Sequence, residues 1–372
     1  MRPLRIGVNA LYLIPGGVGG TEIYLRCLLN ALGEIDSANH YVIFTNRETG
    51  PGIAPAKPNF SVAQQPVRAS VRPARLIWEQ TGLPIALRRQ RLDVLFSPGF
   101  TSPVLCSCPT VTVFHDLQHK RHPEYFRWFD LPFWLLLLWQ SAHSSTRLLA
   151  VSEATRDDLL HYYNIPARKT RVVLHGVEER FFEIARKRSG LPLEPYLLAV
   201  STLHPHKNLD RLIRAFARLR SGRADLRLII AGLHGFHTET LERLIRELGL
   251  VDAVRLTGWL SREDLADLYL RAYAYINTTL FEGFGMPALE ALAAGIPTAC
   301  SAIEPLKSVV ASAALLFDPM DEAAILDAMV RVTSDQQLRA RLSAAGPARA
   351  SQFSWRKSAE QTLDLLREAA GS

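Results

Sequence analysis

The sequence has few cysteines for its length, and they form no metal-binding pattern. Only four occur in 372 residues, namely Cys27, Cys106, Cys108 and Cys300. No two of them stand at the spacing of a zinc-ligand pair, and so few in a large chain are typical of a reducing compartment. We therefore expect a cytoplasmic protein.

No apolar run is long enough to cross a membrane. The longest, Leu131–Trp139, is bounded by Asp130 and Gln140 and contains Pro132, whereas a spanning helix needs about 20 apolar residues. The N-terminal segment Leu4–Val8 enters a strand pattern directly, without the long apolar core of a signal peptide. The sequence predicts neither a spanning helix nor a signal peptide.

The familiar nucleotide-binding motifs are missing as well. No G-x-x-x-x-G-K-[ST] sequence is present, which excludes a P-loop. Four glycines do occur within Pro15–Glu22, between a predicted strand and a predicted helix, where backbone N–H groups can approach an anion at a positive helix end. The dinucleotide fingerprint fails, because Glu22 stands where its third glycine belongs and the next strand ends in Thr45-Asn46, without an acidic residue for the ribose. A glycine-rich turn without a ligand is the alternative.

Length and composition suit two globular domains. The chain is 48% apolar and 21% charged, and 372 residues are too many for one typical core. Residues 1–190 hold 23 Lys and Arg against 15 Asp and Glu, whereas the remainder is near neutral. A basic half suits an anionic partner, that is nucleic acid, a membrane surface or a phosphorylated acceptor. A solvated surface on which arginine replaces lysine is the alternative.

Short aliphatic runs alternate with amphipathic stretches along the chain, which is typical of doubly wound parallel sheets. The predicted strands are Arg5–Asn9, Tyr41–Thr45, Asp93–Ser97, Thr110–Phe114, Arg147–Val151, Thr170–Leu174, Tyr196–Val200, Leu226–Ala231, Val254–Thr257, Tyr273–Asn277 and Pro297–Cys300. The predicted helices are Glu22–Leu32, Glu153–Tyr163, Leu209–Leu219, Thr238–Leu248, Ser261–Arg271 and Pro287–Ala294. A charged stretch with glycine and prolines at 185–195 predicts an interdomain linker. Two α/β domains in tandem predict a ligand cleft between the carboxyl ends of their sheets.

Two segments place reactive side chains where strands end. His115, with Asp116 beside it, directly follows a buried strand, and strand ends are where such folds put their chemistry; a structural histidine is the alternative. Lys207 stands at the start of a helix, where the macrodipole disfavours a cation. A phosphate between Lys207 and the helix end would explain this placement, and a solvated lysine is the alternative.

The segment Glu282–Glu290 carries the most information. Glycines 283 and 285 bring backbone amides to the surface, and Pro287 suits a first helical turn. Glu282 precedes the helix whereas Glu290 lies about one turn inside it, so the two need not share a proton. They are interpreted as two acceptors for sugar hydroxyls rather than as an acid–base pair.

In this order and spacing, these segments resemble the retaining glycosyltransferases of family 4, the "glycosyl transferases group 1" superfamily. Val172–Phe181 and Phe353–Glu360 also resemble family segments, and Asp116-Leu with His122–Phe126 is similar to the mannosyltransferase-like branch. The resemblance covers nearly the whole chain and implies the GT-B fold, two Rossmann-like doubly wound domains facing across a cleft. It implies an acceptor-binding domain at 1–187, a nucleotide-sugar-binding domain at 188–350, and a helix at 351–372 that crosses back to the first domain.

The resemblance also implies roles for individual residues. Glu282 would bind the donor sugar hydroxyls, Glu290 the nucleotide ribose, and Lys207 the diphosphate. His115 would lie beside the reacting sugar and the acceptor. The remaining donor-binding residues would be Gly19, Gly20, Ser201, Thr202, Gly283, Phe284, Gly285 and Met286.

The implied chemistry needs neither a metal nor a cofactor. The family works without a metal, and no Asp-x-Asp sequence is present to hold one; Lys207 and helix ends would then neutralise the leaving diphosphate. The new bond would keep the α configuration, with the departing phosphate accepting the acceptor's proton. Neither glutamate would be a nucleophile, since that role needs a carboxylate close to the anomeric carbon.

Three departures from the family pattern stand out. Ser201-Thr202 occupy the place of an arginine often found before the lysine loop, with His206 preceding Lys207. Ser308 replaces an acidic residue, which puts donor contacts near it in doubt. Asn277-Thr-Thr replaces the usual Pro-Ser-Ser, a change expected to be harmless.

The expected reaction moves a hexose, with mannose from GDP-mannose as the leading donor, to a saccharide or lipid-linked saccharide in polysaccharide or glycoconjugate biosynthesis. Nucleic acid is not expected as a partner. A binding subunit that holds a nucleotide sugar without transferring it, and a nucleotide-sugar epimerase, are the alternatives. The run Leu131–Trp139, with Trp128 and the cations Lys120 and Arg121 nearby, is compatible with a peripheral contact with the inner face of the plasma membrane, where it would dock a lipid-linked acceptor. A buried interdomain or core helix explains the run as well and is the favoured interpretation.

Overall fold

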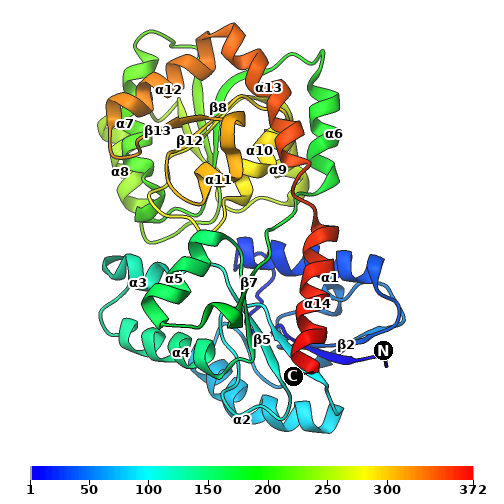
Figure 1. The fold of residues 1–372 in the computed structure, drawn as a ribbon. Helices are drawn as coiled ribbons and strands as arrows, with labels where there is room; N and C mark the ends of the chain where they lie inside the picture. The colour runs from blue at the N-terminus through cyan, green and yellow to red at the C-terminus, as the bar shows by residue number, and fades with distance from the viewer. Residues whose placement is uncertain (1, 372) are drawn as a thin grey trace. The chain divides into compact units, whose positions relative to one another are not determined.

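The computed structural model describes residues 2–371 and divides into two α/β units (Figure 1). Unit 1 consists of the chain up to Gly176 together with the C-terminal segment from Ser354, and unit 2 is Val177–Phe353. The chain therefore passes from unit 1 to unit 2 and returns to unit 1 at its end.

The boundaries differ from those expected after residues 187 and 350. The stretch interpreted as a linker contains the end of helix α6 (Glu179–Arg188) and the start of strand β8 (Glu194–Val200). Helix α6 is part of unit 2, because Phe181 packs edge-on against Tyr269 with ring centroids 5.2 Å apart. Arg188 also donates hydrogen bonds to three backbone carbonyls of residues 269–272. Its positive charge therefore marks a packed helix end and not a solvated linker.

A seven-stranded parallel sheet forms the centre of unit 1. Across the sheet, the strands are β3 (Phe60–Gln64), β2 (His40–Thr45), β1 (Arg5–Asn9), β4 (Val94–Ser97), β5 (Thr110–Phe114), β6 (Arg147–Ala150) and β7 (Thr170–Val172). Strands β4 and β5 are buried along their whole length. This burial explains their continuous apolar or β-branched sequences, since parallel sheets are covered on both faces.

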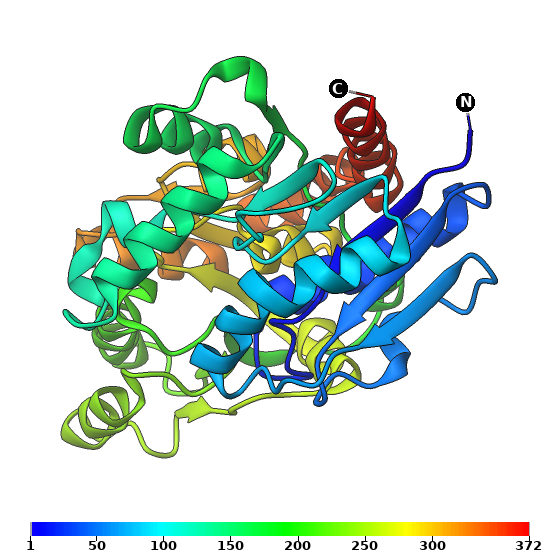
Figure 2. The same cartoon turned by 90° about the horizontal axis from the view of Figure 1, so that it is seen from below.

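The helices of unit 1 are α1 (Gly20–Ile35), α2 (Arg72–Gln90), α3 (Gln118–Arg121), α4 (Leu131–Ser144), α5 (Glu153–Tyr163) and α14 (Trp355–Ala370). Leu83 and Leu87 of α2 pack on β2 and β4, and Leu138 of α4 packs on β5 and β6. Figure 2 shows α2 and α4 next to each other. The guanidinium of Arg72 in α2 lies over the ring of Trp134 in α4. Helix α14 lies alongside α1 although the two are far apart in the sequence (Figure 1).

A six-stranded parallel sheet forms the centre of unit 2. Its strands, in order, are β10 (Val254–Leu256), β9 (Arg227–Ala231), β8, β11 (Ala272–Asn277), β12 (Thr298–Ser301) and β13 (Leu315–Phe317). Besides α6, its helices are α7 (Leu209–Arg220), α8 (Thr238–Glu247), α9 (Arg262–Arg271), α10 (Met286–Ala293), α11 (Leu306–Val310), α12 (Glu322–Ser334) and α13 (Gln336–Ala350). Helices α7, α8 and α12 contribute apolar faces to one core with the sheet.

These two sheets confirm the predicted α/β class with two doubly wound, Rossmann-like units. In each sheet the strand order reverses beside the first strand, so that β1 neighbours β4 in unit 1 and β8 neighbours β11 in unit 2. Ligands of open α/β sheets bind outside the carboxyl ends of the strands at such a switch point. The loops after β1 and β4, and those after β8 and β11, are therefore the places to look for a site.

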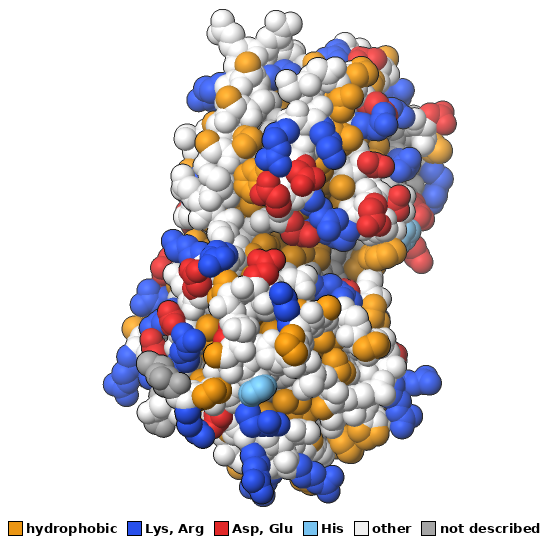
Figure 3. All heavy atoms as spheres, turned by 90° about the vertical axis from the view of Figure 1, so that its right-hand side faces the viewer, with side chains coloured by type: hydrophobic (Ala, Val, Ile, Leu, Met, Phe, Trp, Pro, Cys, Tyr) orange, Lys and Arg blue, Asp and Glu red, His pale blue; other side chains and the backbone are white. Residues whose placement is uncertain are grey.

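The basic half of the sequence does not gather into a patch of one sign on the face drawn in Figure 3. Lys and Arg side chains are scattered over both units there, with Asp and Glu among them. On this face the surface is of mixed charge.

Candidate active site

The switch point of unit 2 brings Lys207 and Glu282 together. Lys207 Nζ donates to Glu282 Oε2 at 2.7 Å, and the two side chains are 15% and 18% exposed. Lys207 ends the short helical turn Pro205–Lys207 after β8, and Glu282 follows β11. Because the carboxyl ends of β8 and β11 are neighbours in the sheet, two residues 75 positions apart meet here.

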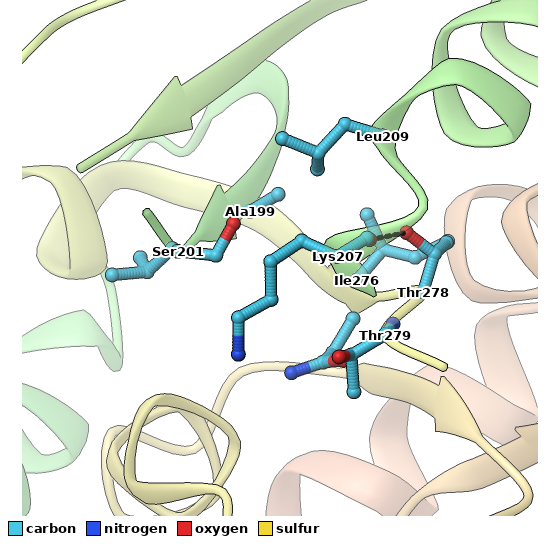
Figure 4. A pocket seen from close by; sticks show the side chains of 9 residues that line it. Ala199, Ser201, Lys207, Leu209, Ile276, Thr278 and Thr279 are labelled. Atoms are coloured by element: carbon cyan, nitrogen blue, oxygen red, sulfur yellow. Dashed lines mark hydrogen bonds between the residues drawn. The ribbon is translucent and has the colours of Figure 1, made fainter. Parts of the chain in front are cut away.

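A small pocket lies between the two strand ends. Figure 4 shows Ser201, Lys207 and Thr279 lining it, together with residues from the ends of β8 and β11. The hydroxyl oxygen of Ser201 is buried and has no hydrogen-bond partner within residues 2–371. This pocket therefore offers an ammonium group and a hydroxyl whose donor capacity is not used inside the described chain.

The loop that carries Lys207 is fixed by hydrogen bonds to the segment after β11. Thr278 Oγ1 donates to the carbonyl oxygen of Lys207 at 3.1 Å, and the amide of Leu280 donates to that of His206 at 2.7 Å. Asn208 adopts a left-handed conformation with φ 56°, and its side-chain amide donates to the carbonyl oxygens of Thr278 and Pro319. The two loops form one rigid support, which preorganises Lys207 against Glu282.

Helix α10 starts directly beside this pair. Gly285 precedes its first residue with φ 98°, and a Cβ atom there would lie 2.4 Å from Leu306 Cδ2, so only glycine fits without strain. Pro287 occupies the first turn, where its missing N–H costs nothing. Gly283 and Met286 are partly exposed, whereas Phe284 is buried. The positive end of α10 thus lies next to Lys207 and can add to its attraction for an anion.

Glu290 has different neighbours from Glu282. It is 7% exposed, and its carboxylate accepts from Arg262 Nη2 at 3.1 Å and from the Tyr269 hydroxyl at 3.0 Å. Burial raises the pKa of Glu290, and the charge of Arg262 opposes this effect. Arg262 also pairs with Glu178, and although burial lowers its pKa, the two carboxylates raise it overall. Any ribose hydroxyl that reaches Glu290 therefore meets a carboxylate that is already paired.

Arg262 and Glu178 are members of this cluster that sequence reasoning missed. Arg262 is the first residue of α9, after Ser261, whose side-chain oxygen accepts from the amide of Asp264 at 3.0 Å. That cap was predictable from the sequence. The pairing with Glu178 and Glu290 was not, because it joins three distant segments of the chain.

The glycine-rich segment of unit 1 connects β1 to α1. Gly16 and Gly19 have φ values of 72° and 60°, the left-handed region that favours glycine. The amide of Gly16 donates to Glu22 Oε2 at 2.7 Å, and Glu22 also pairs with Arg26 at 2.8 Å. One amide of this loop is therefore bound within the chain, while Gly20 begins α1 and is exposed.

His115 directly follows β5 and is 8% exposed. Its Nε2 lies 2.8 Å from the carbonyl oxygen of Pro98; because a carbonyl only accepts, Nε2 carries the proton and Nδ1 keeps a lone pair. Burial lowers the pKa of His115 to about 4, although the bond to Pro98 opposes this shift. The imidazole is therefore neutral at pH 7, a form that can accept a proton.

Aromatic residues surround His115, and sequence reasoning gave none of them a role. Its ring lies 4.9 Å from that of Tyr24 and 5.9 Å from that of His175, which in turn lies 5.6 Å from Trp355. The segment around Gly176 must stay close to α14, because a Cβ atom at Gly176 would lie 2.0 Å from the amide nitrogen of Trp355. The C-terminal helix thus supports the environment of His115.

The predicted residues fall into two groups, one in each unit. In unit 2, Lys207 and Glu282 touch each other, Ser201 and Thr202 belong to the same loop, and Gly283–Met286 lead into α10. Glu290 points to Arg262 and Tyr269 instead. In unit 1, Gly19 and Gly20 lie after β1, and His115 lies after β5.

Two further features are absent from the part of the chain that the structure describes. No group of three or more His, Cys, Asp and Glu side chains is arranged to hold a metal ion among residues 2–371. Within the same residues, no helix combines the length and apolarity required to span a bilayer.

Comparisons with known proteins agree over residues 18–349. Residues 18–181 match the model of "Glycosyltransferase Family 4", and residues 181–349 match that of "Glycosyl transferases group 1". The chain is 30% identical over 307 residues to O-antigen chain mannosyltransferase B of Escherichia coli, covering 80% of this chain and 78% of that protein. It is also 30% identical over 326 residues to MMP alpha-(1->4)-mannosyltransferase of Mycolicibacterium hassiacum, covering 82% and 75%.

Solved structures share the fold. Sucrose-phosphate synthase from Thermosynechococcus elongatus superposes with a TM-score of 0.79 at 20% identity, covering 99% of this chain and 100% of that one. WaaG, a glycosyltransferase involved in lipopolysaccharide biosynthesis, gives 0.76 at 17% identity, covering 97% and 99%. HepE of Anabaena, in complex with UDP and glucose, gives 0.75 at 19% identity, covering 98% and 99%.

Proposed function

This chain belongs to the group 1 glycosyl transferases and is a glycosyltransferase of GT-B fold, and from that premise we propose which transfer it performs. It moves a hexose from a nucleotide-diphosphate sugar to a saccharide or lipid-linked saccharide acceptor, and the new linkage is α. The reaction serves polysaccharide or glycoconjugate biosynthesis on the cytoplasmic side of the membrane.

The ion pair of Lys207 and Glu282 at the start of α10 carries this proposal. Lys207 and Glu282 neutralise each other's charge at 2.7 Å. A nucleotide sugar changes both partnerships: its diphosphate takes the ammonium group and the positive end of α10, and its hydroxyls donate to the carboxylate. The residues that bind the donor are thus held in place by one another before it arrives.

Retention of the α configuration at the anomeric carbon of the donor sugar follows from the roles assigned to Lys207, Glu282 and the leaving phosphate. Lys207 stabilises the negative charge that develops on the leaving diphosphate. Glu282 is engaged with Lys207 and acts as a hydroxyl acceptor, so it is not a nucleophile. The departing phosphate takes the proton of the acceptor hydroxyl on the same face of the sugar. His115 of unit 1, neutral at pH 7, is assigned to acceptor binding.

Mannose from GDP-mannose is the proposed donor. The support is the similarity to two proteins named mannosyltransferases. A thermal-shift panel of nucleotide sugars tests it, because a ligand present at about 100 times its Kd stabilises a protein by about 2.7 kcal/mol. We expect GDP and GDP-mannose to raise the Tm. Stabilisation by UDP or ADP compounds alone would overturn the choice of donor but leave the transfer reaction standing.

Incubation of the purified chain with donor and acceptor separates transfer from the two rival activities. A binding subunit gives a thermal shift but no product. An epimerase converts the donor when no acceptor is present. We expect a glycosylated product only when donor and acceptor are both present.

We also propose that α4 contacts a membrane surface. Trp128, Phe129, Phe133, Leu136 and Trp139 are between 46% and 83% exposed. The opposite side of α4 is buried against the sheet through residues such as Leu138, so a core helix accounts for only part of its apolar residues. Exposed aromatic side chains with nearby cations suit the headgroup region of a bilayer, where a lipid-linked acceptor would lie.

Liposome flotation tests this contact. At low salt we expect the wild type to float with anionic vesicles, and the double variant Phe133→Ser, Leu136→Ser to stay in the dense fraction. Phe236→Ser, which removes a 75% exposed aromatic side chain from unit 2, is the matched control. Equal flotation of all three proteins, or none by the wild type, would contradict the contact without affecting the enzymatic proposal.

A further inference from the structure

Two arginines of α2 have no ion pair with any residue in the described range 2–371. Arg75 is only 7% exposed, and Arg72 is partly buried. Neither guanidinium lies within 4.0 Å of a carboxylate oxygen anywhere in residues 2–371. The Nε atom of Arg75 and the Nη2 atom of Arg72 are buried, and neither donates a hydrogen bond to any acceptor within the same residues. Since buried arginine side chains are normally paired and hydrogen-bonded, these donors point to a ligand.

Glu79, one turn further along α2, does not serve as their partner. Burial lowers the pKa of Arg75, and the negative charge of Glu79 opposes this effect in part. The two side chains are nevertheless not in ion-pair contact. Glu79 is 1% exposed, and its Oε2 accepts a hydrogen bond from Thr101 Oγ1 at 3.0 Å. Burial also raises the pKa of Glu79, which disfavours its negative charge. Arg75 therefore has no carboxylate in ion-pair contact within residues 2–371.

Arg72 is oriented by an aromatic ring. Its guanidinium carbon lies 3.7 Å from the centre of the Trp134 ring of α4. Stacking of this kind fixes the plane of the guanidinium and leaves the N–H groups at its edge free to bind. Arg72 and Arg75 are three positions apart on α2 and lie on the same side of the helix. Together they present two cations from adjacent turns.

These arginines lie at the same edge of the sheet as His115. Thr101, which donates to Glu79, follows β4, and Asn9 at the end of β1 lies close enough to Glu79 to lower its pKa. Between them, Gly99 packs so closely on Tyr12 that a Cβ atom would lie 2.3 Å from its ring. Pro98, the next residue towards β4, accepts the hydrogen bond of His115. The arginines and His115 are thus linked through the loop after β4, at the carboxyl ends of β1, β4 and β5 where ligands bind.

We propose that Arg72 and Arg75 bind a phosphate group of the acceptor. This inference rests on the proposed transferase function, in which unit 1 binds the acceptor. The planar guanidinium fork matches the oxygens of an oxyanion in a bidentate manner. A phosphate group carries a charge of about −1.5 to −2 at pH 7, so two arginines match its charge. A carboxylate carries a single negative charge and would need only one arginine. The phosphate belongs to a sugar phosphate or to a lipid-linked acceptor.

The test is a thermal shift with inorganic phosphate, recorded while a saturating nucleoside diphosphate occupies the donor site. We expect phosphate to raise the Tm of the wild type, and Arg75→Gln and Arg72→Gln to lose most of this rise. Arg89→Gln, which removes an exposed arginine of the same helix, should respond like the wild type. If Arg75→Gln does not fold, Arg75→Lys is the alternative variant. It keeps the positive charge on a shorter side chain without the guanidinium fork, and it should reduce the phosphate-induced rise in Tm several-fold.

Equal responses of the wild type and the Arg75 and Arg72 variants, or no response of the wild type, would overturn the site. The shift caused by the nucleoside diphosphate is read separately, so a failure of the donor assignment is not confused with a failure of this inference. Two further probes, glucose 6-phosphate in solution and vesicles that contain a polyprenyl phosphate, distinguish the sources of the phosphate. If the Arg75 variant binds at least one of these probes more weakly than the wild type, the site is supported. If the variant and the wild type bind both probes equally well, the site is contradicted.

Discussion

At the scale of single residues, Lys207 shows how a cation is tolerated at the start of a helix. The macrodipole disfavours a positive charge there, and Glu282 offsets it at 2.7 Å. Both side chains keep some exposure, 15% and 18%, so the pair is accessible and can exchange partners. A fully buried pair would be slower and more costly to open.

Truncation of either member of this pair should remove most activity without unfolding the chain. We expect Lys207→Ala and Glu282→Ala to lower the rate of sugar transfer by about 10²–10³-fold, because each removes a preorganised contact to the donor. Arg186→Ala is a suitable control, since it breaks an ion pair with Glu179 that is more than 60% exposed on both sides. Transfer at the wild-type rate by both site variants would refute the assignment of this site.

Three buried histidines of unit 1 predict loss of stability in acid. Burial lowers the pKa of His115 and His119 to about 4 and that of His175 well below its usual value of 6.5. The unfolded chain therefore binds more protons than the folded one between pH 6.5 and about 4, and stability falls as the pH is lowered through this range. Each group contributes up to about 1.4 kcal/mol per pH unit there.

Urea unfolding at a series of pH values measures this effect. The wild type should lose stability steadily below pH 6.5, and His175→Asn should show a shallower slope. His161→Gln, at an exposed position of α5, should keep the wild-type slope. A pH-independent stability of the wild type between pH 6.5 and 4 would show that these side chains are not held neutral by the fold.

At the scale of elements, the start of α10 depends on one glycine. Gly285 combines a φ of 98° with a Cβ position 2.4 Å from Leu306 Cδ2. A side chain there strains the backbone and pushes α11 away. We expect Gly285→Ala to cost about 1–3 kcal/mol of stability and to reduce transfer, because the amides at the start of α10 shift. Gly222→Ala, whose Cβ would meet its nearest atom at 3.9 Å, should change neither quantity.

The buried elements were easier to predict than the others. Strands β1 and β5 and helix α5 have the predicted bounds. The sequence of β5 is a continuous apolar or β-branched run, and Ser152 caps the start of α5. Strand β3 was missed because it lies at the edge of the sheet and its middle residues are exposed. Helix α2 was missed because Pro84 and several arginines interrupt its apolar pattern. Its Leu83 and Leu87 nevertheless pack in the core, so tertiary contacts override the local signal.

At the scale of the whole molecule, the last helix completes the first unit. The chain leaves unit 1 at Gly176 and returns at Ser354, so α14 packs beside α1 and against β4, β5 and β6. Leu366 of α14 is 1% exposed. The stability of unit 1 therefore depends on residues that lie about 180 positions beyond Gly176 in the sequence.

Leu366→Ala should destabilise unit 1 by about 2–5 kcal/mol, the usual cost of a large cavity in a core. Hydrogen exchange should show faster exchange in α1 and α14, with the amides of unit 2 little changed. Glu360→Ala, on the exposed side of α14, is the control. Uniform acceleration over both units would mean that they unfold as one, and protection of α1 in the variant would contradict the packing.

The sequence by itself determined the fold class and the local setting of the site. Periodicity, turn residues and caps are local, so they revealed the alternating strands and helices and placed Lys207, Glu282 and His115 at element ends. Only the tertiary structure decided which side chains meet, because contacts between Lys207 and Glu282, or Arg262, Glu178 and Glu290, join segments that the sheet order brings together. Only the tertiary structure revealed that Arg72 and Arg75 of α2 are unpaired within residues 2–371. Burial and the absence of an ion pair are properties of the packed chain.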